Sequence, residues 1–148
     1  MTGKADFTEG EWRVVLEGPP SAGLIVVTAQ RGGTLRETLA IAKAYVDARK
    51  EHGESQLLDE IVSAKPELDH TRYHSAEELK EQGLQHLRNA VELLEQKATP
   101  EELADYRRFV LNLADKVANA HREDGDSVSA DERAAIEAIA ASLGTTAP

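Results

Sequence analysis

The stretch TPEELADYRRFVLNLADKV (Thr99–Val117) gives the clearest indication of the fold class. It starts with a threonine, then a proline, and has a glutamate three residues after the threonine, which is the arrangement of a capping box at a helix start. Apolar residues then recur every three or four positions, as on the buried face of a helix, at Tyr106, Val110, Leu113 and Val117. This stretch therefore predicts a long amphipathic helix over 100–121.

The same capping signature recurs along the chain. A hydroxyl residue is followed three positions later by glutamate at Thr8…Glu11, Thr34…Glu37, Ser75…Glu78, Thr99…Glu102 and Ser129…Glu132. The stretches after these caps carry apolar stripes with helical spacing, at Leu35, Leu39, Ala42 and Val46, at Leu84, Leu87, Val91 and Leu94, and at Ile136, Ile139 and Leu143. Five such starts predict an all-helical protein.

Helix ends and loops complete this prediction. A shorter helix is expected over 56–64, with Leu57, Leu58, Ile61 and Val62 inward and Pro66 after its end. Gly144 is placed to end the last helix. We expect loops at 32–33, 52–54, 65–74 and 123–129, and a flexible tail at 145–148. The prediction is an all-α, single-domain bundle of about seven helices over residues 1–148.

The N-terminal stretch allows two interpretations. The stretches Arg13-Val-Val-Leu16 and Leu24-Ile-Val-Val27 flank the segment Gly18-Pro-Pro-Ser-Ala-Gly23. β-Branched residues favour two strands around a turn, but an isolated hairpin needs a partner sheet, and no other segment offers one. We therefore expect two short helices joined at Gly18–Pro20.

Composition excludes several classes of function. The chain has 148 residues, no cysteine and a formal net charge of −10. The absence of cysteine excludes disulfides and thiolate metal sites and fits a reducing, cytoplasmic compartment. The acidic balance disfavours nucleic acid as a partner. No apolar run approaches the roughly 20 residues of a membrane span, so no membrane insertion or secretory signal is expected.

Two segments, 24–46 and 110–143, share the layout of a helix, a turn, a capped start and a second helix, which predicts a pseudo-repeat. The second segment, Leu113-Ala-Asp-Lys-Val-Ala-Asn-Ala-His-Arg-Glu-Asp-Gly125 continuing through Val128-Ser-Ala-Asp-Glu132 to Leu143-Gly144, resembles the second half of the TerB-like (tellurite-resistance) family. The resemblance implies an all-helical module of bacterial stress systems, with acidic residues at its turns proposed to bind divalent cations. Asp124 and Glu132 occupy the matching acidic positions.

The acidic loop is the candidate metal site. Asp124 and Asp126 flank Gly125, which permits a tight turn that would aim both carboxylates at one ion. Hard cations take oxygen ligands of this kind. We therefore consider Asp124, Asp126 and Glu132 as ligands of a weakly bound calcium or magnesium ion.

A helix cap is the alternative interpretation of the same loop. An EF-hand is excluded, because Val128 and Ala135 would occupy ligand positions five and twelve. Asp131 and Glu132 would instead complement the dipole of the following helix. His70 and His74 are four residues apart, but they lie in an expected loop, where that spacing has little meaning. His86, between two leucines, is interpreted as a boundary residue of the core.

The sequence contains no phosphate-binding loop, nucleophile elbow or zinc-protease motif. We expect Trp12, Tyr45, Tyr106 and Phe109 to fill the core. The sequence therefore predicts a non-enzymatic module that binds a cation weakly and has a protein partner. The alternatives are a metal-independent protein-interaction or structural domain, for which exposed helix faces permit a homodimer, and a small hydrolase that uses His74 with a carboxylate.

Overall fold

A computed structural model describes residues 3–29, 35–50, 55–66, 73–122 and 130–144. It contains a 3-10 turn η1 (Lys4–Asp6) and the helices α1 (Glu9–Ala29), α2 (Leu35–Lys50), α3 (Gln56–Ser63), α4 (Ala76–Lys97), α5 (Pro100–Arg122) and α6 (Ala130–Leu143). No strand occurs in these ranges, so the all-α prediction is confirmed. The loops predicted around 32–33, 52–54 and 123–129 and the tail lie outside the described residues.

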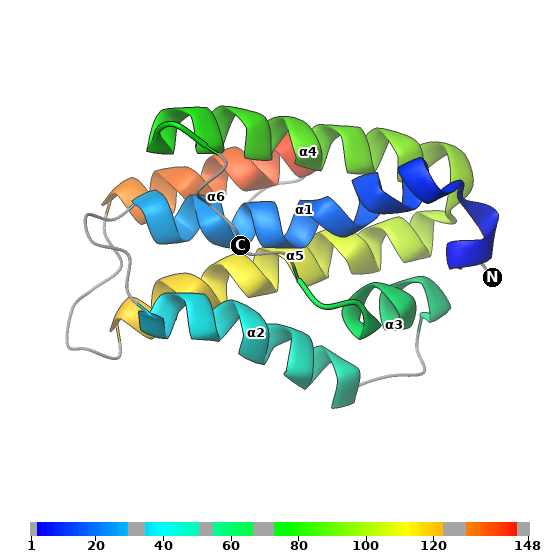
Figure 1. Cartoon of the computed structure of the whole chain (residues 1–148), viewed down its shortest axis with the longest axis horizontal. Coiled ribbons are helices and arrows are strands. Elements are labelled where there is room, and N and C mark those ends of the chain that lie inside the picture. The colour runs from blue at the N-terminus through cyan, green and yellow to red at the C-terminus, as the bar shows by residue number, and fades with distance from the viewer. Residues whose placement is uncertain (1–2, 30–34, 51–54, 67–72, 123–129, 145–148) are drawn as a thin grey trace.

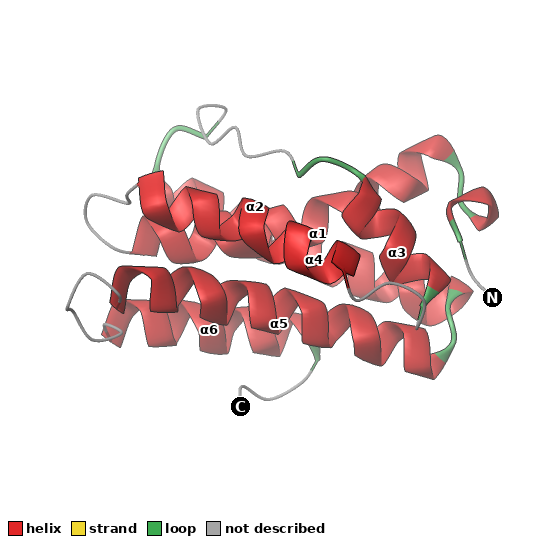
Figure 2. Ribbon diagram, turned by 90° about the horizontal axis from the view of Figure 1, so that it is seen from below, coloured by secondary structure: helices red, strands yellow, loops and turns green. Residues whose placement is uncertain are grey.

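The bundle is built around α1. In Figure 1 α1 runs through the middle of the molecule, with α4 above it and α5 and α2 below. Figure 2 shows α5 and α6 side by side in one row, with α1, α2 and α4 in a second row. Helix α1 packs against α2, α4, α5 and α6. Its position between the other long helices explains why every residue from Gly18 to Val27 is buried.

Capping boxes begin α1 and α5 as predicted. The Glu11 amide donates to the Thr8 hydroxyl at 3.1 Å, and the Thr8 amide donates to the Glu11 carboxylate at 2.9 Å. Thr99 and Glu102 exchange the same two bonds at the start of α5. Helix α4 has one of the two hydrogen bonds of a capping box: the Glu78 amide donates to the Ser75 hydroxyl. The Glu78 carboxylate accepts from the amide of His74 rather than from that of Ser75.

The prediction of two short helices in the N-terminal stretch is wrong, and so is the hairpin alternative. One helix, α1, continues through Gly18, Pro19 and Pro20, so the described residues form six helices where about seven were expected. The reason is burial. The four aliphatic side chains of residues 24–27 are at most 8% exposed, and each contributes roughly 1.5–3 kcal/mol. Together they match or exceed the cost of two interior prolines, about 3 kcal/mol each.

A tyrosine from α5 compensates for one of these prolines. Pro19 has no N–H group, so the carbonyl of Val15, four residues earlier, loses its donor within the helix. The Tyr106 hydroxyl donates to that carbonyl at 2.8 Å in a buried position. Burial raises the pKa of Tyr106 well above its ordinary value, which keeps the hydroxyl protonated as a donor. Gly18 permits this approach, because a Cβ there would lie 2.1 Å from the Tyr106 oxygen.

The core contains the predicted aromatic residues: Trp12, Tyr45, Tyr106 and Phe109 are all at most 8% exposed. The stripes predicted for α4, α5 and α6 face inward, and Gly144 follows α6 with a positive φ of 77°. The stripe predicted for α2 is wrong. Leu39 and Val46 are 57% and 42% exposed, and α2 instead buries Ile41, Ala44 and Tyr45.

Candidate functional site

The structure describes one of the three predicted metal ligands. Asp124 and Asp126 lie outside the described residues. Glu132 lies in the first turn of α6, and its side chain is fully buried. Within the described ranges no group of three His, Asp or Glu side chains could hold a metal ion. The calcium or magnesium site therefore stays a prediction.

Of the three histidines considered in the sequence, the structure describes His74 and His86. His70 lies outside the described residues. His74 is exposed, and its amide donates to the Glu78 carboxylate at 2.7 Å, so it belongs to the cap of α4. His86 lies at the edge of the core, as predicted, with 22% of its side chain exposed.

A pocket of the described surface lies along one face of α1. Its volume is about 590 Å³, within the range of small-molecule sites. The apolar part of its lining comprises Phe7, Trp12, Leu16, Pro20 and Leu24. The charged part comprises Lys4, Glu9, Arg13, Glu17 and Lys65. Thr8 and Ser21 supply hydroxyl groups. We call this feature the α1 pocket.

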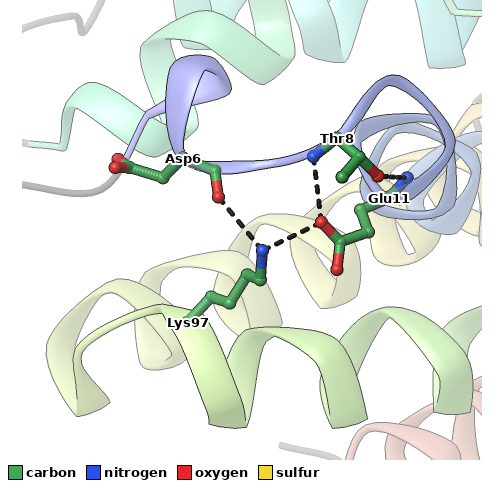
Figure 3. Close-up of polar contacts among 4 residues, drawn as sticks. All are labelled: Asp6, Thr8, Glu11 and Lys97. Atoms are coloured by element: carbon green, nitrogen blue, oxygen red, sulfur yellow. Dashed lines mark hydrogen bonds and ion pairs between the residues drawn. The ribbon is translucent and has the colours of Figure 1, made fainter.

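Lys97 fixes the end of the α1 pocket that is formed by the N-terminal residues. Its ammonium group donates to the Asp6 carbonyl at 3.1 Å and to the Glu11 carboxylate at 2.8 Å (Figure 3). It also lies 5.5 Å from the centre of the Phe7 ring. The Lys97 hydrogen bond and the capping amide of Thr8 lower the pKa of Glu11. These contacts join the end of α4 to the start of α1 and place Phe7 and Thr8 in the pocket wall.

Helix α3 holds the other side of the N-terminal turn. The main-chain amide of Lys4 donates to the carboxylate of Glu60. Gly3 lies against the same helix, because a Cβ at Gly3 would be 2.8 Å from the side-chain nitrogen of Gln56. The pocket wall therefore depends on contacts between η1 and two helices that follow it much later in the chain.

Ser21 and His86 form a polar link at the pocket. Ser21 Oγ and His86 Nδ1 are hydrogen-bonded at 3.0 Å, and His86 Nε2 lies 3.9 Å from a carboxylate oxygen of Glu17. The three residue types match a nucleophile, a base and an acid. However, Ser21 lies inside α1, where the following amides are committed to the helix and cannot form an oxyanion hole. The arrangement therefore supports a cross-helix hydrogen bond between α1 and α4 better than it supports catalysis.

No motif or spacing in the sequence indicates the α1 pocket. Its lining combines the N-terminal residues Lys4, Phe7 and Thr8 with one face of α1 and with Lys65. Ser21 is separated from His86 by 65 positions. The one available signal was the run Gly18-Pro-Pro-Ser-Ala-Gly23, in which several residues are unfavourable in a helix. A segment that tolerates such residues must be supported by tertiary contacts.

Helix α2 presents another hollow, of about 310 Å³, against α5. The exposed Leu39 lines it, together with Lys116 and Asp47, whose charged groups are 3.5 Å apart. The predicted protein partner and homodimer stay predictions. Among the described residues, α2 carries both exposed large aliphatic side chains, Leu39 in this hollow and Val46 outside its lining.

Comparisons with protein families, with curated proteins and with solved structures found no match. The TerB-like resemblance and the stress-associated role that it implies therefore stay predictions. Across the described parts of the chain, no helix is both long enough and apolar enough to cross a membrane.

Proposed function

We propose that this chain is a non-enzymatic helical module that binds a small, largely apolar molecule in the α1 pocket. The observation that carries the proposal is a concave site of about 590 Å³ whose apolar lining is accompanied by a few polar groups. This combination is typical of ligand sites. The contacts of Lys97 and Glu60 with the N-terminal turn support it, because they hold the wall of the pocket in place without a ligand.

The chemistry of the pocket favours binding over catalysis. Its serine is buried in a helix and bonded to His86. His74, the residue of the predicted hydrolase, is not part of the pocket lining. The proposal also does not depend on the acidic loop, so a cation site at Asp124, Asp126 and Glu132 would be a separate property of the same module.

Trp12 offers a direct test, because it is the only tryptophan of the chain and lines the pocket. We expect 1-octanol, a neutral apolar probe, to change Trp12 emission in a saturable manner and to raise the melting temperature, since a ligand of the native state stabilises it by mass action. Leu16→Gln, which removes an apolar side chain from the lining, should abolish both responses.

Leu111→Gln is the matched control. Leu111 is also a partly buried leucine packed against the core, but it lies on α5 and is not part of the pocket lining. This variant should keep both responses to octanol. The absence of a saturable response in the wild type, or its loss in both variants alike, would contradict the proposal.

A further inference from the structure

We propose that the α1 pocket selects a ligand with an aliphatic tail and a carboxylate head, so that the tail lies on the apolar lining and the cations of the rim bind the head. This inference rests on the proposed function and adds the chemical class of the ligand. It follows from the charges around the pocket rather than from its size.

Three cations line the pocket: Lys4, Arg13 and Lys65. All three are exposed, and none of the ion pairs among the described residues involves them. The protein as a whole is strongly acidic, with 27 acidic and 17 basic residues. A rim with more basic than acidic groups therefore reverses the overall charge balance, and it favours an anionic head group.

One of the two carboxylates of the lining is less able to repel an anion than its formal charge suggests. Glu9 lies in the first turn of α1, where the positive end of the helix dipole offsets its charge. Arg13, Lys4 and Lys65 have no comparable partner among the described carboxylates, so their charge remains available to a ligand.

The apolar part of the lining explains why a tail is required. Leu16, Pro20 and Leu24 follow one another at spacings of four residues along α1, and Trp12 extends the same row toward the N-terminus. A tail placed along this row would bury apolar surface worth roughly 0.8 kcal/mol per methylene group. A free inorganic anion would gain only exposed ion pairs, which are weak.

The experiment compares three probes with the same tail on the full chain: octanoate, 1-octanol and octylammonium, titrated at neutral pH and followed by Trp12 emission and calorimetry. Octanoate should bind about three- to tenfold more tightly than octanol, the effect expected of one or two partly exposed ion pairs, and octylammonium should bind most weakly. The preference should decrease as salt is added, because exposed charges are screened.

The double variant Arg13→Gln, Lys65→Gln should lose the preference for octanoate while retaining its affinity for octanol. The matched control is Lys80→Gln, Arg133→Gln, which changes the net charge equally at exposed positions outside the pocket lining. This control should keep at least half of the preference.

The outcomes separate the two proposals. Equal binding of octanoate and octanol, or tightest binding of octylammonium, would overturn the carboxylate inference and leave the proposed function standing. Binding of none of the three probes would overturn the proposed function and the inference with it. A preference reduced equally by both double variants would reflect net charge alone and would also overturn the inference.

Discussion

Helices α1 and α2 lie in the same row of the bundle (Figure 2). The helix whose local sequence is less favourable for a helix, α1, is nevertheless the more deeply buried of the two. Helix α1 contains Gly18, Pro19 and Pro20, which disfavour a helix, yet it is continuous and buried from Gly18 to Val27. Helix α2 is free of glycine and proline, yet it leaves Leu39 and Val46 exposed. Local propensity therefore does not indicate how much of a helix the tertiary structure buries.

The two helices differ in burial because α1 contacts more neighbouring helices than α2 does. Helix α1 is in contact with α2, α4, α5 and α6, so burial on several sides compensates for unfavourable residues. Helix α2 lies at the edge of the row (Figure 1) and packs chiefly on α5 and α3. A helix at the edge buries one face only, and the face that it buries depends on how it is rotated against its neighbours.

The largest expected change in the free energy of unfolding distinguishes the buried face of α2 from its exposed face. Ile41→Ala should lower the free energy of unfolding by about 2–5 kcal/mol, because Ile41 is fully buried and the change leaves a cavity. Leu39→Ala on the same helix should change it by no more than about 0.5 kcal/mol, because Leu39 is 57% exposed. Urea unfolding followed by circular dichroism measures both. Equal losses would show that α2 is rotated differently against α5.

The next effect compares two glycines of α1. Gly18→Ala should destabilise the protein by about 1–3 kcal/mol, since the new Cβ would overlap the buried Tyr106 hydroxyl at 2.1 Å. Gly10→Ala is the control, because a Cβ at Gly10 would have no atom within 4 Å apart from its chain neighbours and the nearby backbone of its own helix. It should be neutral or stabilising by at most about 1 kcal/mol through helix propensity. The same urea measurement applies, and a stabilising Gly18→Ala would contradict the close packing of Tyr106.

The smallest effect concerns the compensation for Pro19. Tyr106→Phe should cost about 1–2 kcal/mol, because it leaves the buried Val15 carbonyl without the hydroxyl donor. In a Pro19→Ala background the same change should cost less, because residue 19 then supplies an N–H group to that carbonyl. A double-mutant cycle measures the coupling. The same cost in both backgrounds would show that Tyr106 acts through packing alone.

Much of the local structure could be predicted from short stretches of sequence. The capping boxes of Thr8 with Glu11 and of Thr99 with Glu102 form as expected, because both partners lie within one helical turn. The stripes of α4 and α5 also face the core, since long amphipathic helices have one strongly apolar face. The α2 stripe could not be predicted, because Ile41 and Leu39 are both apolar and only the packing against α5 distinguishes them.

The α1 pocket could not be predicted from sequence patterns. Its wall depends on Lys97 holding Asp6 and Glu11, which are 91 and 86 positions away. The link between Ser21 and His86 also joins distant segments. No spacing rule connects such residues, because the fold alone brings them together. The predicted cation ligands Asp124, Asp126 and Glu132, in contrast, lie within nine consecutive positions of the sequence.

The sequence by itself determined that the chain is helical, where several helices begin and end, and which aromatic side chains enter the core. These properties depend on hydrogen bonds and apolar periodicity within a few residues. Only the tertiary structure decided that α1 continues through two prolines, which face of α2 is buried and where a pocket opens. Those properties depend on the burial of surface and on hydrogen bonds between helices that are distant in the chain.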